Sequence, residues 1–207
     1  LEYLYSQNLF ETTSFSNEDS DRTKKYQIES KRVAAKKKYT NENDFLKSLK
    51  MNCEINSFND FNIPRVAQLS QRSNQFNLRT IRYTEEDIKR IIDSDQHFGF
   101  SFNLKDRFGD HGLICVVVLN QISDDTLLIE NWLMSCRVLK RGMEKFTLNY
   151  LVNFCKKNKF KFIVGEYIKS EKNSLVKNHY SDLGFEKINK KWKLNLSNYS
   201  KLKTHIE

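Results

Sequence analysis

Three consecutive apolar stretches, separated by very short polar connections, constrain the fold of this chain more than any other feature. They are HFGFSFNLK (97–105), GLICVVVLNQI (112–122) and TLLIENWLMS (126–135), and the connections are centred on residues 108–110 and 123–125. Connections this short favour antiparallel neighbours in a sheet. The middle of the chain is therefore predicted to form three adjacent strands.

Helices and further strands are predicted on both sides of this unit. Asn62 with Pro64 close behind, and Thr84 with Asp87 three residues on, are typical helix starts. CEINSF, FKFIVGEYI and FEKINKKWKLNL predict strands, and KNSLVKNHYSDLG predicts a helix. Another helix is predicted before FKFIVGEYI. Its buried face is predicted to be made by Met143, Phe146, Tyr150, Leu151 and Phe154. This order predicts an α+β fold with a mixed central sheet flanked by helices.

Residues 1–50 differ from the rest of the chain. The run DRTKKYQIESKRVAAKKKYT is polar and helix-prone, with few positions that could build a core. We expect residues 1–50 to form a helical linker and residues 51–207 to form the folded domain.

Composition and charge restrict the class of protein. The chain has 207 residues, 13% of them aromatic, and a formal net charge of +9, which is typical of a folded, basic protein. Such a charge suits an acidic partner, for example a carrier protein or a phosphorylated metabolite. The lysines are scattered rather than gathered in one basic stripe, so no nucleic-acid partner is expected. No apolar run is long enough to cross a bilayer, so no membrane partner is expected either.

The cysteines predict neither a metal site nor disulfides. Cys53, Cys115, Cys136 and Cys155 show no C-x-x-C spacing and have no paired histidines nearby. A reducing, cytoplasmic location fits this pattern best.

The segment WLMSCRVLKRGMEKF (132–146) runs from a strand through a basic turn into a helix. Residues 137–143 resemble the R/Q-x-x-G-x-G/A pyrophosphate loop of GNAT-type acetyltransferases. N–H groups at such a helix start face an anion. Lys140 stands in place of the first glycine and Met143 in place of the final small residue, which argues against ordinary coenzyme A binding. The expected cofactor-binding residues are Arg137, Val138, Lys140, Arg141 and Gly142.

A second segment resembles the same fold. Asn173, Tyr180 and Leu183-Gly184-Phe185 match the N-x-x-x-x-x-x-Y-x-x-L-G-F segment found in many GNAT-type proteins. Asn173 and Tyr180 are therefore expected to contact substrate.

Cys136 is a candidate nucleophile. A thiol beside Arg137, Lys140 and Arg141 at a helix start should have a stabilised thiolate. His111 lies in the preceding hairpin, where it could orient toward the thiol with Asp110 behind it. Packing of Cys136 in the strand, with His111 as a turn residue, is the alternative reading of these spacings.

Polar side chains crowd around one aromatic residue after the first predicted helix of the domain. The run is Arg72-Ser73-Asn74-Gln75-Phe76-Asn77. Its asparagines could bond the backbone of a loop or contact substrate. The expected substrate-binding residues here are Arg72, Asn74, Gln75 and Asn77.

A family resemblance covers nearly the whole chain. The segments FNIPRVAQLSQRSNQFNLRTIRYTEEDI, DRFGDHGLICVVV, ENWLMSCRVLKRGME, GEYIKSEKNS and HYSDLGF resemble, in order, the C-terminal part of FkbH-like proteins. Those proteins join an N-terminal phosphatase domain of the haloacid-dehalogenase (HAD) type to a GNAT-like domain. The resemblance implies transfer of a glyceryl unit from bisphosphoglycerate to an acyl carrier protein, in polyketide-type (methoxymalonyl-carrier) biosynthesis.

The resemblance also implies roles and partners. Cys136 would hold the glyceryl group as a thioester, with His111 as base or orienting group. The cofactor would be the phosphopantetheine of an acyl carrier protein, or coenzyme A, with magnesium only in the phosphatase domain. The partners would be the carrier protein, a small phosphorylated acyl donor and the HAD-type domain of the same polypeptide, whose tail residues 1–50 resemble.

Two alternatives stay open. The chain could be a coenzyme A-dependent acetyltransferase in which the thiol is incidental, or a non-catalytic module that docks a carrier protein.

Overall fold

The computed structural model describes the backbone from Asn17 and the side chains from Gln27 to Glu207. It consists of two units, residues 1–45 and 46–207. The first contains α2 (Asn17–Lys36), and α3 (Glu42–Ser48) crosses into the second. In the part of the chain described, no helix is both long enough and apolar enough to cross a membrane.

A seven-stranded sheet in the order β1-β2-β3-β4-β5-β7-β6 forms the second unit. β4 and β5 pair in parallel, and the other neighbours are antiparallel. This confirms the predicted α+β fold with a mixed sheet. The strands are β1 (Asn52–Ser57), β2 (His97–Asp106), β3 (Gly109–Ser123), β4 (Thr126–Met134), β5 (Phe162–Gly165), β6 (Glu186–Ile188) and β7 (Lys191–Asn195).

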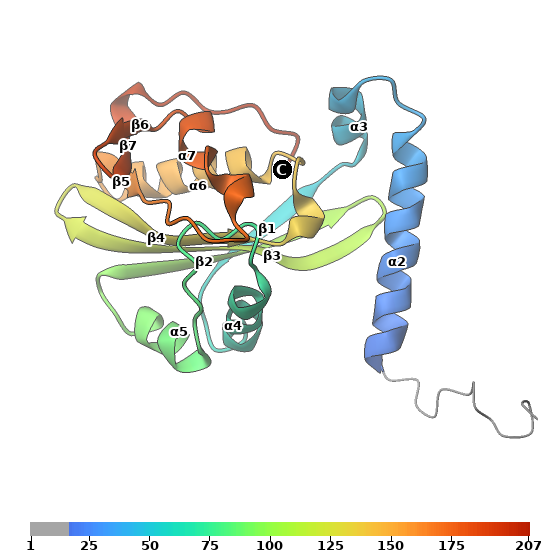
Figure 1. Ribbon diagram of the computed structural model, residues 1–207, viewed down its shortest axis with the longest axis horizontal. Helices are drawn as coiled ribbons and strands as arrows, with labels where there is room; N and C mark the ends of the chain where they lie inside the picture. Colours follow the sequence, from blue (N-terminus) through green and yellow to red (C-terminus); the bar gives the residue numbers. More distant parts are fainter. Residues whose placement is uncertain (1–16) are drawn as a thin grey trace, which may run out of the picture. The chain divides into compact units, whose positions relative to one another are not determined.

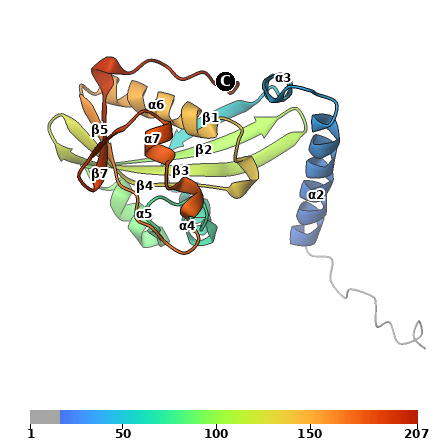
Figure 2. The same cartoon turned by 45° about the horizontal axis from the view of Figure 1, so that its top comes forward.

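Helices cover both faces of this sheet (Figures 1 and 2). α4 (Ile63–Arg72) and α5 (Glu85–Ile92) lie on one face, while α6 (Met143–Lys157) and α7 (His179–Asp182) lie on the other. Three short 3-10 turns complete the unit, at Cys136–Val138 (η1), Ser174–Val176 (η2) and Leu196–Asn198 (η3).

The helix starts on the first face follow the sequence signals. Pro64 stands in the first turn of α4. At α5 the N–H of Asp87 donates to Thr84 Oγ1 at 3.1 Å, and the N–H of Thr84 donates to Asp87 Oδ2 at 2.8 Å. This is the predicted capping box, which satisfies two N–H groups at the helix start. The predicted last strand is instead the hairpin of β6 and β7, because Asn189 turns the chain at a φ of 56°.

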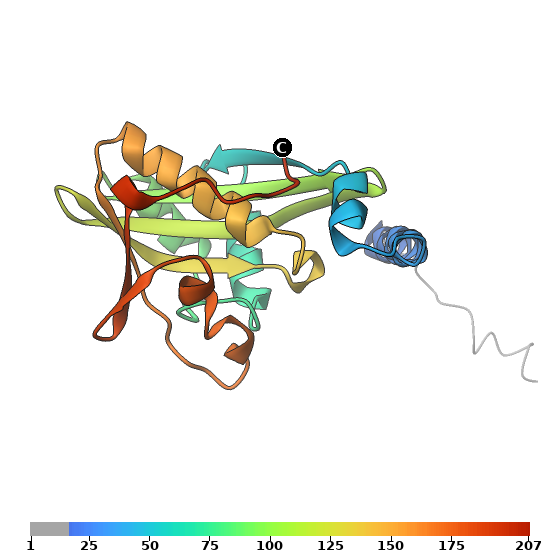
Figure 3. The same ribbon diagram turned by 90° about the horizontal axis from the view of Figure 1, so that it is seen from above.

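The buried face of α6 is rotated from the predicted one. Met143 and Leu151 are buried as expected, but Phe146, Tyr150 and Phe154 are half-buried. The fully buried positions also include Thr147, Leu148, Asn149, Val152 and Cys155. The C-terminal segment runs beside α6 toward β1 (Figure 3), where the N–H of Glu207 donates to the carbonyl of Met51 at 3.0 Å.

β4 has an irregularity that positions the candidate site. Val118 of β3 pairs with Asn131 and Leu119 pairs with Ile129, so Glu130 is an extra residue on β4. Such a bulge bends a strand and redirects its side chains. The parallel pairing of β4 with β5 ends at Ile129↔Gly165, so these two segments separate from the bulge onward. We call this opening, between residues 130–134 and 166–168, the divergence.

Candidate functional site

The loop after β4 makes a tight turn into α6. The Ser135 hydroxyl accepts from the N–H and the guanidinium of Arg137, at 3.5 and 3.1 Å, and so caps η1. Lys140 and Gly142 then adopt left-handed backbone, with φ of 63° and 81°. A side chain in this conformation costs about 1–2 kcal/mol, which explains why a glycine is usual where Lys140 stands.

The position of Gly142 corrects one expectation. Counted from Arg137, the final small residue of the pyrophosphate pattern is Gly142, and Met143 is already the first residue of α6. Lys140 is thus the remaining departure from the pattern.

This loop presents cations and unpaired N–H groups. The N–H groups of Val138 and Leu139 are used within η1, at 3.3 and 3.4 Å from their acceptors. Within the described residues, those of Lys140 and Gly142 donate no hydrogen bond. Arg137 and Lys140 are exposed. Free N–H groups beside cations at the start of a helix are suited to hold an anion.

The expected chain of Asp110, His111 and Cys136 is not assembled. His111 Nε2 lies 3.0 Å from Asp106 Oδ2 and 3.0 Å from Arg141 Nη1. Asp106 is the strand-end residue whose other oxygen accepts from the turn N–H groups at 108 and 109, so it is fixed beside the ring. Asp110 instead accepts from the N–H of Gly112 at 2.7 Å.

Cys136 lies apart from these groups. It is exposed, and among the described residues its thiol makes no hydrogen bond. Arg141 is drawn inward, where its Nη1 lies 3.4 Å from Asp106 Oδ2. Of the predicted cofactor residues, Arg141 therefore ties the loop to the β2–β3 hairpin, while Val138 is buried.

Two of the predicted substrate residues are used within the chain. Asn173 is fully buried, and its amide donates to the carbonyls of Asn77 and Ile168 at 3.0 and 2.9 Å. Its oxygen accepts from Ser170 and Tyr167. An asparagine side chain has two donor and two acceptor positions, so none is left for a ligand.

Asn77 is used in the same way. Its oxygen accepts from the N–H of Thr80 at 2.8 Å, and its amide donates to the carbonyls of Ser73 and Ile81. Asn74 accepts from Arg82 at 2.5 Å on the wall of a hollow of about 270 Å³. Arg72 and Gln75 are exposed. Asn77 thus has the structural role that the sequence left open, and Asn173, which was expected to contact substrate, has a structural role as well.

A polar cluster that the sequence did not reveal surrounds the bulge of β4. Glu130 Oε2 lies 3.2 Å from His97 Nε2, and Tyr83 donates to Glu130 Oε1 at 3.2 Å. The other ring nitrogen of His97 lies 2.8 Å from Ser94 Oγ. Burial and the adjacent Glu130 carboxylate raise the pKa of Tyr83, so it stays a donor. Glu130 is the one charged residue of β4, which was the signal available in the sequence.

Arg79 spans the divergence beside this cluster. Its Nη1 donates to the Glu130 carbonyl at 3.1 Å, and its Nε lies 3.1 Å from Glu166 Oε2. Glu130, His97, Tyr83 and Ser94 line a hollow of about 360 Å³. The carboxylate of Glu130 therefore lies where β4 and β5 separate, next to space for a small substrate.

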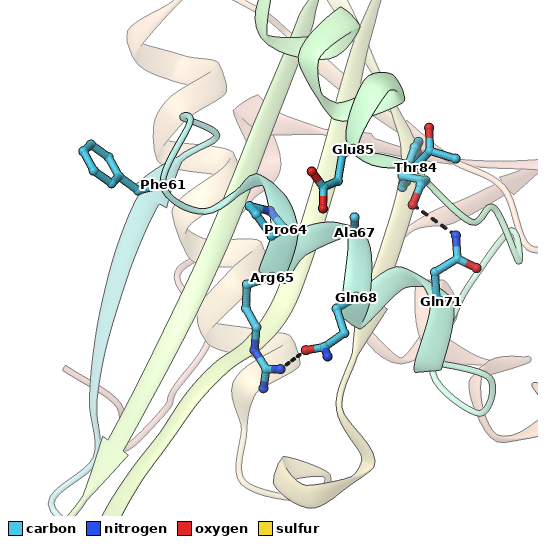
Figure 4. A pocket seen from close by; sticks show the side chains of 9 residues that line it. Phe61, Pro64, Arg65, Ala67, Gln68, Gln71, Thr84 and Glu85 are labelled. Atoms are coloured by element: carbon cyan, nitrogen blue, oxygen red, sulfur yellow. Dashed lines mark hydrogen bonds between the residues drawn. The ribbon is translucent and has the colours of Figure 1, made fainter. Parts of the chain in front are cut away.

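Another hollow lies over α4 and the start of α5 (Figure 4). It measures about 530 Å³. Its polar side chains pair among themselves: Arg65 donates to Gln68, and Gln71 donates to the carbonyl of Tyr83 at 3.1 Å. The charged residues that line it are Arg65 and Glu85, and we assign no catalytic role to this hollow. In the described part of the chain, no group of three or more metal-ligating side chains is gathered.

Buried groups close the divergence on the α7 side. His179 is 7% exposed, and burial lowers its pKa to about 3, so the ring is neutral. Tyr180 is buried as well, and burial raises its pKa. Gly165 faces the Tyr180 ring so closely that a Cβ there would lie 2.2 Å from it. Tyr180 is thus held against the end of β5.

Comparisons with known proteins identify the fold. No family model and no curated protein matches the sequence. Among solved structures, the ribosomal-protein-S18-alanine N-acetyltransferase from Escherichia coli matches with a TM-score of 0.54 and 13% identity, over 72% of this chain and 96% of that one. Spermidine N-acetyltransferase from Vibrio cholerae, in complex with coenzyme A and spermine, matches with a TM-score of 0.55 and 12% identity, over 70% and 96%.

A third match is the GNAT domain of an S. lividans protein, with a TM-score of 0.54 and 12% identity over 69% of this chain and 90% of that one. Identities this low establish the shared fold and leave activity to be argued from the site. The folded unit of this chain has the GNAT fold.

Proposed function

We propose that this chain is an acyltransferase that takes an acyl group from the thioester of coenzyme A and transfers it to an amine. The observation that carries this proposal is the Glu130 carboxylate at the point where β4 and β5 separate, held by Tyr83 and His97. The likeness to N-acetyltransferases, one of them in complex with coenzyme A, supports it.

The residues at the start of α6 fit the phosphate end of coenzyme A. The N–H groups of Lys140 and Gly142 are unpaired within the described residues, and the cations of Arg137 and Lys140 are exposed beside them. Backbone N–H groups with flanking cations are the usual means of holding a pyrophosphate. Bound acyl-coenzyme A would supply an activated thioester carbonyl, and as the amine forms its C–N bond the C–S bond would break and coenzyme A would leave as its thiol.

The chain's own part in the reaction is to accept a proton. An amine that attacks a carbonyl becomes a better nucleophile when it gives up a proton to a positioned base. Glu130 can receive that proton at Oε2, and His97 can relay it because its second nitrogen contacts Ser94 at 2.8 Å. Tyr83 fixes the carboxylate by donating to the other oxygen.

The test is transfer of acetyl from acetyl-coenzyme A to a panel of primary amines, followed by mass spectrometry, with wild type and Glu130→Gln. The variant keeps the shape of the side chain and removes the base. We expect its rate to fall by about 10²–10⁴-fold with the coenzyme A affinity unchanged. Glu186→Gln, at an exposed position, is the matched control and should retain the wild-type rate. Equal rates for all three proteins would contradict the role of Glu130.

A second candidate is the glyceryl transfer that the FkbH-like resemblance implies. The observation that favours it is the exposed Cys136, which is followed in the loop by the exposed cations of Arg137 and Lys140. After incubation with bisphosphoglycerate and an acyl carrier protein, this candidate predicts a hydroxylamine-labile adduct on Cys136 by intact mass. The coenzyme A proposal predicts no such adduct.

A further inference from the structure

Residues 76–78 lie inside the divergence, paired with β4 like a short additional strand. We call them the insert. The N–H of Leu78 donates to the carbonyl of Trp132 at 3.1 Å, and the N–H of Met134 donates to the carbonyl of Phe76 at 3.0 Å. On the other side, the N–H of Ile168 donates to the carbonyl of Leu78 at 2.9 Å. The insert therefore bridges β4 and the chain that leaves β5.

The insert occupies an edge of β4 that would otherwise be open. β5 pairs with β4 only up to Ile129. Beyond that point, the outward groups of β4 at 132 and 134 are satisfied by the insert alone. A strand edge of this kind binds any extended chain that carries amide groups.

The insert covers buried polar atoms that it does not satisfy. The Phe76 ring contacts the His179 ring edge-on with centroids 5.1 Å apart, and the Trp132 ring lies 4.5 Å from His179 on the same side of the structure. Among the described residues, His179 Nε2 has no hydrogen-bond partner although it is buried. The Tyr180 hydroxyl lies near the backbone of Glu166 without reaching hydrogen-bond geometry. Buried groups without a partner need an explanation, and a polar group of a bound ligand is one that would satisfy them.

We propose that the insert holds the place of the pantetheine arm of the acyl donor and leaves it when the donor binds. This inference rests on the proposed function, and it adds a displaceable segment to it. The loop with Lys140 and Gly142 follows Met134, the last residue of β4, so the arm of a donor held there by its phosphates would start beside this strand edge. The arm carries amides, so it can take over the bonds to Trp132 and Met134 that the insert makes.

Hydrogen exchange on the wild-type protein tests this directly. With saturating coenzyme A, the amides of Leu78 and Ile168 should lose protection, because both bond through the insert. The amide of Met134 should stay protected, because the arm replaces Phe76 as its acceptor. Adenosine 3′,5′-bisphosphate, which has no arm, should leave all three amides unchanged. If coenzyme A binds while Leu78 and Ile168 keep their protection, the inference is overturned.

Loosening the insert should tighten donor binding. Phe76→Ala removes the ring contact with His179 and leaves the bonds of β4 in place. Because the competent, open form then becomes more populated, the affinity for coenzyme A should rise by about tenfold. The affinity for adenosine 3′,5′-bisphosphate should not change. Phe58→Ala is the matched control, since Phe58 is equally buried but packs against Gly99.

The outcomes separate this inference from the proposed function. Displacement of the insert by coenzyme A without acyl transfer would contradict the function alone. Acyl transfer with the insert protected throughout would contradict the inference alone. If neither wild type nor Phe76→Ala binds coenzyme A, both fail. The exchange experiment needs only wild type, so it decides even if Phe76→Ala does not fold.

Discussion

The exposed loop after β4 and the half-buried polar cluster in the divergence beside it are two neighbouring regions that differ in how their residues come together. In the loop, Cys136, Arg137 and Lys140 are close together in the sequence, and all three are exposed. In the divergence, Glu130 and His97 are far apart in the sequence and lie 3.2 Å apart. A site that is easy to see in a sequence is thus not the one in which groups act on one another.

The asparagines show why buried polar residues differ from exposed ones. Asn77 and Asn173 looked like ligand-binding residues, but each uses its side chain to satisfy backbone groups of irregular segments. Buried backbone groups must be paired, and these segments have no strand or helix partners to do it. The insert and the divergence therefore depend on two side-chain amides.

The largest effect on stability should come from Asn173→Ala. The change removes the bond to the buried Asn77 carbonyl and the half-buried bonds to the Ile168 carbonyl and the Ser170 N–H. We expect a loss of about 3 kcal/mol in the free energy of unfolding, measured by urea titration. Asn74→Ala, at a half-buried position, should cost no more than about 0.5 kcal/mol. Equal losses for the two variants would break the contrast between buried and exposed asparagines.

The next effect is a pH dependence that originates at His179. Its folded-state pKa is lowered from 6.5 to about 3 by burial, so between these values the unfolded chain binds the extra proton. The protein is therefore most stable above pH 6.5, where His179 is neutral in both states, and it loses stability as the pH falls toward 3. Between pH 7 and 4.5 the wild type should lose about 2 kcal/mol more than His179→Phe, which keeps an aromatic ring without the titration. Denaturant titrations at both pH values measure this difference. Equal losses for wild type and His179→Phe would mean that the His179 ring is exposed to solvent in the folded protein.

Much of the fold could be predicted, because its signals are local. Short connections gave the antiparallel centre, and the capping residues Thr84 and Asp87 marked the start of α5. The loop of residues 137–142 could also be predicted, since a strand end and a helix start frame it. The cluster at Glu130 could not, because the strand bulge and the pairing of distant strands bring its members together. The carboxylate beside His111 could not be predicted either, because the geometry of the hairpin brings Asp106, and not Asp110, next to the ring.

A smaller effect should follow from the backbone of the loop. Lys140 is held at a φ of 63°, where glycine has no steric cost. Lys140→Gly should therefore raise the melting temperature, by an amount equivalent to about 1 kcal/mol. Lys145→Gly, on an exposed position within α6, is the matched control and should lower stability by about 1 kcal/mol. A gain in stability for Lys140→Gly and a loss for Lys145→Gly would sharpen the distinction between a strained loop and a regular helix. A gain in both, or a loss in both, would remove it.

The smallest effect on stability should come from Cys136, and it bears most directly on the comparison of the two regions. Iodoacetamide should modify Cys136 first, because burial raises the pKa of Cys53 and of Cys155 to about 12 and Cys115 is fully buried. The modified protein should keep its stability within about 0.5 kcal/mol, since Cys136 packs against no core.

Acyl transfer by the modified protein then discriminates between the regions. If Glu130 in the divergence accepts the proton, a small group on the exposed thiol should leave the rate within about twofold, since it touches none of the reacting groups. A complete loss of transfer, with Glu130→Gln still active, would assign the chemistry to the loop. The exposed loop with Cys136 would then be the reactive region, and the polar cluster around Glu130 would serve only to hold β4 and β5 apart.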